Sequence, residues 1–112
     1  MSEIKEISVR DIYDLCASSA AVNFFDVREP NEYAAIRTDL ARNIPLSSFD
    51  PAAVQQQFKL DPSAPVYLVC RSGKRSYTAC QKLAAHGFAE TYNVVGGMLA
   101  WEEEDLPISS DE

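Results

Sequence analysis

Short apolar runs alternate with helical segments along this chain, and this alternation is the feature that most restricts its fold. The clearest runs are 22–27 and 65–69, both mostly apolar. Such runs are typical of strands in a parallel sheet that is covered on both faces. Because parallel strands need crossover connections, which are usually helical, the alternation predicts an α/β sandwich.

Capping and turn residues indicate where the helices begin and end. Ser8, with an acidic residue three positions later, predicts a capping box, and Asp50 followed by Pro51 predicts another helix start. Gly87 is expected to be the C′ residue of the helix that follows the second apolar run. The other expected elements are a helix from Val9, a short helix at 30–35, an extended stretch at 43–46, a helix from 51 to about 59, a strand at 91–95 and a short helix between 97 and 107.

Length and charge limit the class of protein. The 112 residues fit one domain, 1–112, with a core over about 7–108 and an acidic tail at 109–112. Seventeen Asp and Glu against ten Lys and Arg disfavour a phosphate-backbone interface, so no nucleic-acid partner is expected. The charged start does not resemble a signal peptide, and no window approaches the roughly 20 apolar residues of a membrane span. A cytoplasmic protein without a membrane partner is expected.

The three cysteines do not form a metal-binding pattern, since there is no C-x-x-C and only one histidine, His86. We therefore expect no metal and at least one reactive thiol. Cys16 falls on the apolar side of the first helix and is interpreted as a core residue. Cys80 lies ten residues after Cys70, and a resolving thiol is the less favoured interpretation of it.

The segment Cys70-Arg71-Ser72-Gly73-Lys74-Arg75 carries most of the functional information. It places a cysteine where a buried strand ends and a helix begins, with three cations within five residues. Ordinary cysteine is only about 3% thiolate at neutral pH. Curled backbone N–H groups, the helix N-terminus and the cations would each favour the anion.

Two further residues of this loop have expected roles. Gly73 permits the backbone angle that a tight curl requires, and the Ser76 hydroxyl is expected to cap the helix. The alternative is a core cysteine beside a solvated turn. Cations at a helix N-terminus oppose the dipole, however, so stability alone would not place them there.

The chain resembles the rhodanese-like domains, specifically single-domain thiosulfate-type sulfurtransferases. The resemblance covers about Ile7 to Ile108. It is carried by Asp26-Val27-Arg28-Glu29-Pro30 with Glu32-Tyr33, by Asn43-Ile44-Pro45-Leu46, by the Cys70 loop with Arg75-Ser76, by Leu83 with Gly87-Phe88, and by Gly96-Gly97 with Trp101 and Leu106-Pro107. It implies an α/β/α sandwich with a mostly parallel central sheet of about five strands, and no metal or organic cofactor.

The resemblance also implies a reaction and roles for residues. Cys70 would accept a sulfane sulfur from a small anionic donor such as thiosulfate and pass it, as a persulfide, to a thiol or protein acceptor. The loop backbone from Arg71 through Ser72 and Gly73 to Arg75 would hold the persulfide. Arg71, Lys74 and Arg75 would attract the donor and stabilise the leaving sulfite. Asp26 and Arg28 are expected to support the site, Asp26 by accepting hydrogen bonds from the cysteine loop; a local ion pair, for example of Arg28 with Glu32, is the simpler alternative.

Two alternatives to this enzyme stay open. Related cysteine phosphatases have a loop one residue longer, with the arginine six positions after the cysteine; here Arg75 stands at position five, which favours sulfur transfer. A sulfur carrier or non-catalytic module that docks on a partner protein is the other alternative. The sequence departs from the family at 36–41, where a glycine-rich turn with a histidine is usual, and this predicts a different path for that connection.

Overall fold

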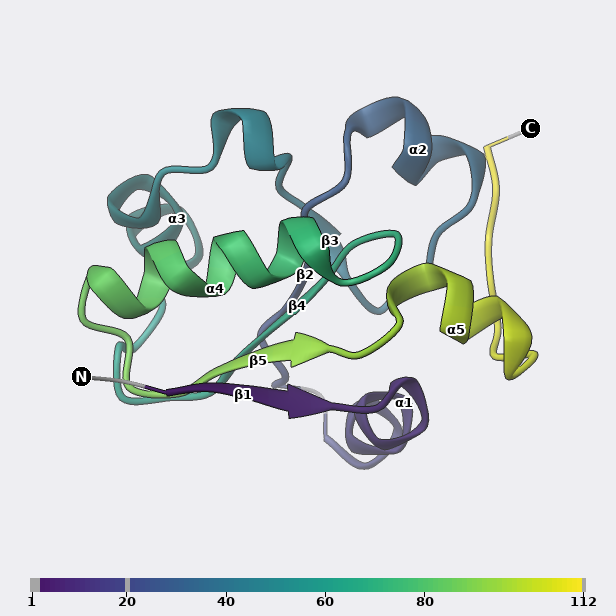
Figure 1. Cartoon of the computed structure of the whole chain (residues 1–112), viewed down its shortest axis with the longest axis horizontal. Helices are drawn as coiled ribbons and strands as arrows, with labels where there is room; N and C mark the ends of the chain where they lie inside the picture. Colours follow the sequence, from purple (N-terminus) through teal and green to yellow (C-terminus); the bar gives the residue numbers. More distant parts are fainter. Residues whose placement is uncertain (1–2, 20, 112) are drawn as a thin grey trace.

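The computed structural model describes residues 3–19 and 21–111, and five strands in them form one parallel sheet (Figure 1). The strand order is β1-β5-β4-β2-β3, and every pairing between neighbours is parallel. The strands are β1 (Ile4–Ile7), β2 (Phe24–Asp26), β3 (Arg42–Asn43), β4 (Val66–Val69) and β5 (Thr91–Val94). The predicted α/β fold with a sheet of about five strands is confirmed.

Helices cover both faces of the sheet (Figure 1). They are α1 (Val9–Ser18), α2 (Pro30–Ala35), α3 (Pro51–Phe58), α4 (Lys74–Ala85) and α5 (Gly97–Glu103), with a 3-10 turn at Leu46–Ser48. Buried residues of α3 and α4 pack with one core cluster and those of α1 and α5 with a second. Phe25 and Phe24, adjacent in β2, point to the first and second cluster respectively, as alternation along a strand requires.

The helix starts follow two of the predicted caps. The Asp11 N–H donates to the Ser8 hydroxyl at 3.1 Å, and the Ala52 N–H donates to the Asp50 carboxylate at 3.2 Å. Gly87 follows α4 with φ +106°, which is the left-handed geometry expected of a C′ residue. The local sequence therefore sets these helix ends.

Strand β1 was not predicted. Its sequence, Ile4-Lys5-Glu6-Ile7, places two adjacent charged residues inside the strand, so the alternation of a half-buried strand is absent. It is one of the two edge strands of the sheet and pairs with β5 alone. The Lys5 ammonium lies 3.1 Å from the Glu90 carboxylate. Charges on an edge strand discourage pairing with other chains.

The connection at 36–41 is held by residues near the end of the chain. Arg37 and Ser109 form an antiparallel bridge, and the Arg37 guanidinium pairs with Asp39 at 2.9 Å and with Asp111 at 2.7 Å. The Ser109 hydroxyl also donates to Asp39. The acidic tail is therefore partly paired with the connection. Within the described residues, no helix is both long enough and apolar enough to cross a membrane.

Candidate active site at the Cys70 loop

Cys70 follows the carboxyl end of β4, the strand that pairs with β2 and β5 near the middle of the sheet. The loop of residues 70–73 then leads into α4. Parallel α/β sheets bind ligands at this edge, because the loops after the strands open there. Cys70 has an exposed fraction of only 1% and belongs to the first core cluster. Its sulfur therefore lies at the base of the loop, while Arg71, Ser72 and Lys74 above it are exposed.

Hydrogen-bond donors converge on the Cys70 sulfur. The Gly73 N–H donates to Sγ at 3.0 Å, and the Ser76 hydroxyl lies 3.3 Å from the same atom. Burial is the largest influence on the Cys70 pKa and would raise it. The hydrogen bonds from the Ser76 hydroxyl and from the N–H groups of Ser76, Gly73 and Ser72 outweigh burial, so the pKa of Cys70 is lowered. Of the loop N–H groups from Arg71 to Arg75, those of Ser72 and Gly73 donate to the sulfur.

Ser76 has a different role from the predicted one. The N-cap of α4 is Gly73, in the left-handed region at φ +115°, and not Ser76. Ser76 is buried in the first turns of α4, and its hydroxyl faces two acceptors, the Cys70 sulfur at 3.3 Å and the Asn93 Oδ1 at 2.5 Å. A hydroxyl has one proton to donate, so it can serve only one of these acceptors well at a time.

Asn93 ties β5 to the loop. Its Nδ2 donates to the Gly73 carbonyl at 3.0 Å, while its Oδ1 accepts from Ser76. Asn93 is buried and was not predicted as a site residue. A polar side chain inside the otherwise apolar end of a buried strand, next to the strand that carries the cysteine, was the available signal.

The start of α5 donates hydrogen bonds to the backbone of the cysteine loop. The Met98 N–H donates to the Cys70 carbonyl at 2.8 Å, and the Leu99 N–H donates to the Arg71 carbonyl at 3.1 Å. A Cβ at Gly97 would lie 2.5 Å from the Arg71 carbonyl oxygen and still closer to that of Cys70. Only glycine allows this close approach of two backbones.

The three predicted cations have different environments. Arg71 and Lys74 are exposed, whereas the Arg75 guanidinium donates to both carboxylate oxygens of Glu32, at 2.6 and 2.9 Å. The hydrogen bond from Arg75 is the main cause that lowers the pKa of Glu32 to about 2. Arg75 therefore differs from the other two cations, since its two Nη atoms already have partners. The expected role of the three cations toward the donor stays a prediction.

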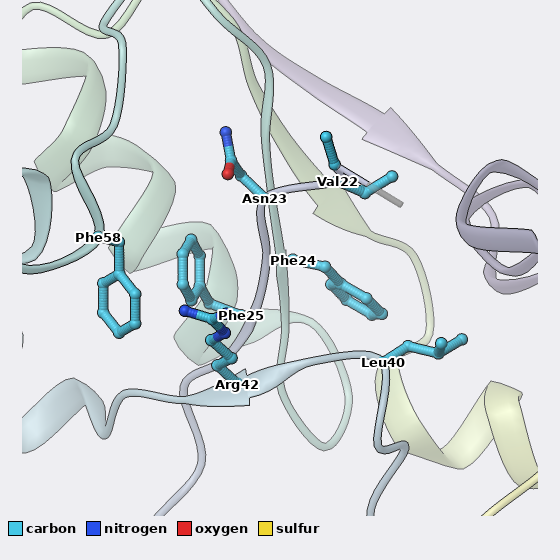
Figure 2. A pocket seen from close by; sticks show the side chains of 8 residues that line it. Val22, Asn23, Phe24, Phe25, Leu40, Arg42 and Phe58 are labelled. Carbon is cyan, nitrogen blue, oxygen red and sulfur yellow. The ribbon is translucent and has the colours of Figure 1, made fainter. Parts of the chain in front are cut away.

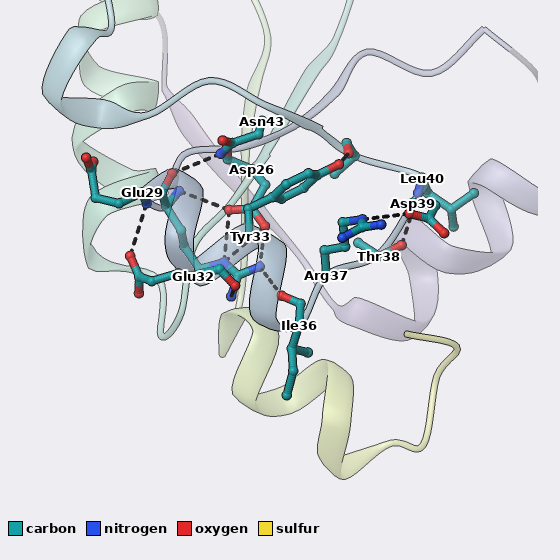
Figure 3. Close-up of polar contacts among 12 residues, drawn as sticks. Asp26, Glu29, Glu32, Tyr33, Ile36, Arg37, Thr38, Asp39, Leu40 and Asn43 are labelled. Atoms are coloured by element: carbon teal, nitrogen blue, oxygen red, sulfur yellow. Dashed lines mark hydrogen bonds and ion pairs between the residues drawn. The ribbon is translucent and has the colours of Figure 1, made fainter. Parts of the chain in front are cut away.

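Asp26 and Arg28 form a buried ion pair with each other. The Arg28 Nε lies 3.0 Å from both Asp26 carboxylate oxygens, and Nη2 lies 2.8 Å from Oδ2 and 2.6 Å from the Ile36 carbonyl. Figure 3 shows Asp26 and Ile36, two of the residues that Arg28 contacts. The prediction that Asp26 accepts hydrogen bonds from the cysteine loop is wrong, because Arg28 occupies its carboxylate. Arg28 meets Glu32 only at the backbone carbonyl.

The remaining candidates are structural. Cys80 has no exposed surface, and burial raises its pKa to about 12. Cys16 is half-buried, and burial raises its pKa as well. Trp101 is buried and donates to the Pro107 carbonyl at 2.9 Å. Phe24, Phe25 and Phe88 are buried in the core, and Phe58 is partly exposed.

A separate pocket of about 230 Å³ lies by the amino ends of β2 and β3 (Figure 2). Val22, Phe25 and Phe58 line it, together with Arg42, whose guanidinium lies 5.4 Å from the centre of the Phe58 ring. Cys70 follows the carboxyl end of β4 and does not line this pocket. The pocket is therefore not part of the cysteine site.

Comparison with known proteins agrees with this fold. The family profile described as rhodanese-like domain matches residues 8–104. The chain is 35% identical over 105 residues to a putative sulfurtransferase of Bacillus subtilis, YtwF, covering 94% of this chain and 97% of that one. A putative sulfur carrier protein of the same organism, YrkF, is 33% identical over 100 residues, covering 89% of this chain and 52% of the relative.

The solved structures extend the likeness to three dimensions. The crystal structure of a rhodanese-like domain protein from Staphylococcus aureus superposes with a TM-score of 0.75 at 30% identity, covering 96% of this chain and all of that one. The chain therefore belongs to the rhodanese-like family. A protein named as a putative sulfurtransferase is among the relatives of this chain.

Proposed function

We propose that the chain is a sulfurtransferase that carries a sulfane sulfur on Cys70 as a persulfide. The observation that carries the proposal is the set of donors around the Cys70 sulfur, the Gly73 N–H at 3.0 Å and the Ser76 hydroxyl at 3.3 Å. These donors favour the thiolate, which is the nucleophilic form of cysteine. The proposal includes one domain spanning 1–112 and a cytoplasmic location, where thiols stay reduced.

The reaction proceeds in two displacements. The Cys70 thiolate attacks the outer sulfur of thiosulfate, so that a new S–S bond forms while the bond to the sulfite sulfur breaks and its electron pair leaves with sulfite. A thiophilic acceptor, such as a thiolate or cyanide, then attacks the terminal sulfur, and the electron pair of the broken S–S bond returns to Cys70. No oxidant is consumed. The exposed cations Arg71 and Lys74 attract the anionic donor, and loop N–H groups stabilise the charge on sulfur.

Loop length favours sulfur over phosphate chemistry. Four residues, 70–73, separate the end of β4 from the start of α4, and N–H groups of this short loop already contact the single sulfur of Cys70. A phosphoryl group carries three further oxygens that would each need a donor. If the chain hydrolysed aryl phosphates and did not use thiosulfate, this preference for sulfur transfer would be wrong.

The test is sulfur loading. The reduced chain is incubated with thiosulfate, freed of small molecules and weighed by mass spectrometry. We expect an adduct of one sulfur atom on Cys70 that cyanide or a thiol removes. The adduct should be absent from Cys70→Ser and present in Cys16→Ser. No adduct on the native chain, or an equal adduct on Cys70→Ser, would sink the proposal.

A sulfur carrier is the second candidate, favoured by the similarity to the relative named as a putative sulfur carrier protein. A carrier would load as readily as an enzyme but would pass sulfur slowly to small acceptors. Steady-state turnover with cyanide and with a small thiol separates the two. Stoichiometric loading with negligible turnover would favour the carrier.

A further inference from the structure

Arg75 differs from the other two cations of the loop in what it contacts. Its Nη1 and Nη2 donate to the two Glu32 carboxylate oxygens at 2.6 and 2.9 Å, across 43 positions of sequence. The Arg75 and Glu32 side chains have exposed fractions of only 34% and 27%. A bidentate pair fixes the plane of the guanidinium and uses the Nη atoms that would otherwise face an oxyanion.

Glu32 is also held independently of Arg75. The Glu29 N–H donates to Glu32 Oε1 at 3.0 Å at the start of α2, and the Arg28 Nη1 donates to the Glu32 backbone carbonyl at 3.4 Å. The carboxylate is therefore placed by α2 and not only by its partner. With a pKa near 2, chiefly because of the Arg75 hydrogen bond, it stays charged wherever a thiolate can work.

We propose that Glu32 is a specificity-determining residue of the sulfur-transfer site, because it pairs with Arg75 and so removes one of three positive charges from the anion-binding loop. The inference rests on the proposed function. Arg71 and Lys74 then remain to attract the donor. A loop with two available cations holds a dianion such as thiosulfate less firmly than a loop with three. It discriminates less against donors with one charge or none, such as organic persulfides.

The size of the effect follows from Coulomb's law. A unit charge several ångströms from a bound anion, at the effective dielectric constant of a protein surface, changes its affinity by about three- to tenfold. Added salt reduces the effect for exposed groups. The pKa of Arg75 is raised mainly by its hydrogen bond to Glu32, and the charge of the Cys70 sulfur adds a smaller contribution, so Arg75 and the sulfur interact electrostatically.

Two alkylating reagents measure this charge without any sulfur transfer. Iodoacetate and iodoacetamide both form an S–C bond with a thiolate and release iodide, but only iodoacetate is an anion. The ratio of their rate constants at Cys70, followed by peptide mass spectrometry, reports the local potential. The intrinsic reactivity of the thiolate largely cancels in this ratio.

The variants form a double-mutant cycle. At low salt, we expect Glu32→Gln to raise the ratio three- to tenfold, Arg75→Gln to lower it by a similar factor, and the double variant to return within about twofold of the native chain. Glutamine keeps an oxygen for the Glu29 N–H. Glu29→Gln is the matched control, since the Glu29 carboxylate accepts from Ser47 and not from Arg75. The control should leave the ratio unchanged.

A ratio that is unchanged in both single variants would overturn the inference, as would a double variant no different from Arg75→Gln. Thermal unfolding is followed for each variant; if Glu32→Gln does not fold, an unchanged ratio in Arg75→Gln alone overturns it. Absence of alkylation at native Cys70 would also overturn it, since the loop would then admit no anion. Sulfur loading with a flat ratio contradicts this inference alone, whereas a ratio that follows the cycle without sulfur loading contradicts the proposed function.

Discussion

Cys70 and Cys80 lie in the same core cluster, ten residues apart, and their chemistry differs. Their exposed fractions are 1% and 0%. Burial is the largest influence on the pKa at both and opposes the thiolate at both. The pKa of Cys70 is nevertheless lowered, while that of Cys80 is raised to about 12. Exposure to solvent therefore does not explain why the two pKa values shift in opposite directions.

The difference lies in the backbone around each sulfur. Cys80 is inside α4, where the N–H groups are used by the helix itself. Cys70 begins an irregular loop, whose N–H groups are free to point at the sulfur, with Gly73 in the left-handed region that makes the curl possible. The pKa of a buried thiol is lowered here because a short loop supplies hydrogen-bond donors that regular structure cannot.

Serine substitutions at Cys70 and Cys80 should give the largest difference in sulfur-transfer activity. Cys70→Ser is expected to lower sulfur transfer on the order of a thousandfold or more, because the nucleophile is lost. Cys80→Ser should keep its activity per folded molecule but lose about 1–3 kcal/mol of unfolding free energy, since it buries a hydroxyl in an apolar cluster. Turnover and urea unfolding of both variants check this. Loss of activity in folded Cys80→Ser would give Cys80 a chemical role.

Removing one hydrogen-bond donor should raise the Cys70 pKa, in the direction of the raised pKa of Cys80. Ser76→Ala deletes the hydroxyl 3.3 Å from the sulfur, so the Cys70 pKa should rise and kcat/KM at pH 7 should fall by about tenfold. The acidic limb of the pH–rate profile should move to higher pH, because activity needs the thiolate. Thiolate absorbance at 240 nm against pH gives the shift directly. An unchanged titration would mean that the backbone N–H groups suffice.

Asn93→Asp tests the shared proton of Ser76. An aspartate at this position would attract the Ser76 proton more strongly than the amide does, would lose the donor to the Gly73 carbonyl and would add a negative charge near the sulfur. Each change raises the Cys70 pKa. We expect a several-fold loss of turnover at pH 7 that is partly recovered at pH 9. Turnover that does not recover at pH 9 would indicate damage to the loop and not a change in titration.

The parts of the site that are local in sequence could be predicted. The strand end, Cys70, Gly73 and the donors of the loop lie within a few residues, and their types alone indicated a nest for an anion. The Ser76 role was predicted wrongly, because helix capping depends on where the helix begins. α4 begins at Lys74, so its N-cap is Gly73, and Ser76 lies inside the first turn. The boundary is set by backbone geometry that the residue types do not reveal.

Contacts between distant segments could not be predicted. The Glu32–Arg75 pair joins residues 43 positions apart, and Asn93 meets Gly73 only because β5 lies beside β4 in the sheet. Strand order decides both contacts, and one sequence does not give strand order. Asp26 lies beside Val69, next to the cysteine loop, but its carboxylate pairs with Arg28 two residues away and not with the loop.

The two thiols should also make opposite contributions to stability as pH changes. The folded pKa of Cys70 lies below its usual value, so its contribution is present above the unfolded pKa, near 8.5–9, and is lost as pH falls through the folded pKa. Cys80 stays protonated in the folded chain up to about pH 12, whereas the unfolded thiol ionises near pH 9. Above pH 9 it therefore destabilises the fold by up to about 1.4 kcal/mol for each pH unit.

Urea unfolding between pH 7 and 10.5 measures these slopes. Comparing the native chain with Cys80→Ala isolates the contribution of Cys80 to unfolding free energy above pH 9, because alanine does not titrate. The loss of stability above pH 9 should be smaller in the variant. Comparing the native chain with Cys70→Ala isolates the stabilising contribution of Cys70, which is lost as pH falls below 9. Equal alkaline slopes in the native chain and in Cys80→Ala would mean that the Cys80 pKa is not raised in the fold, and burial would then not be the cause that separates the two thiols.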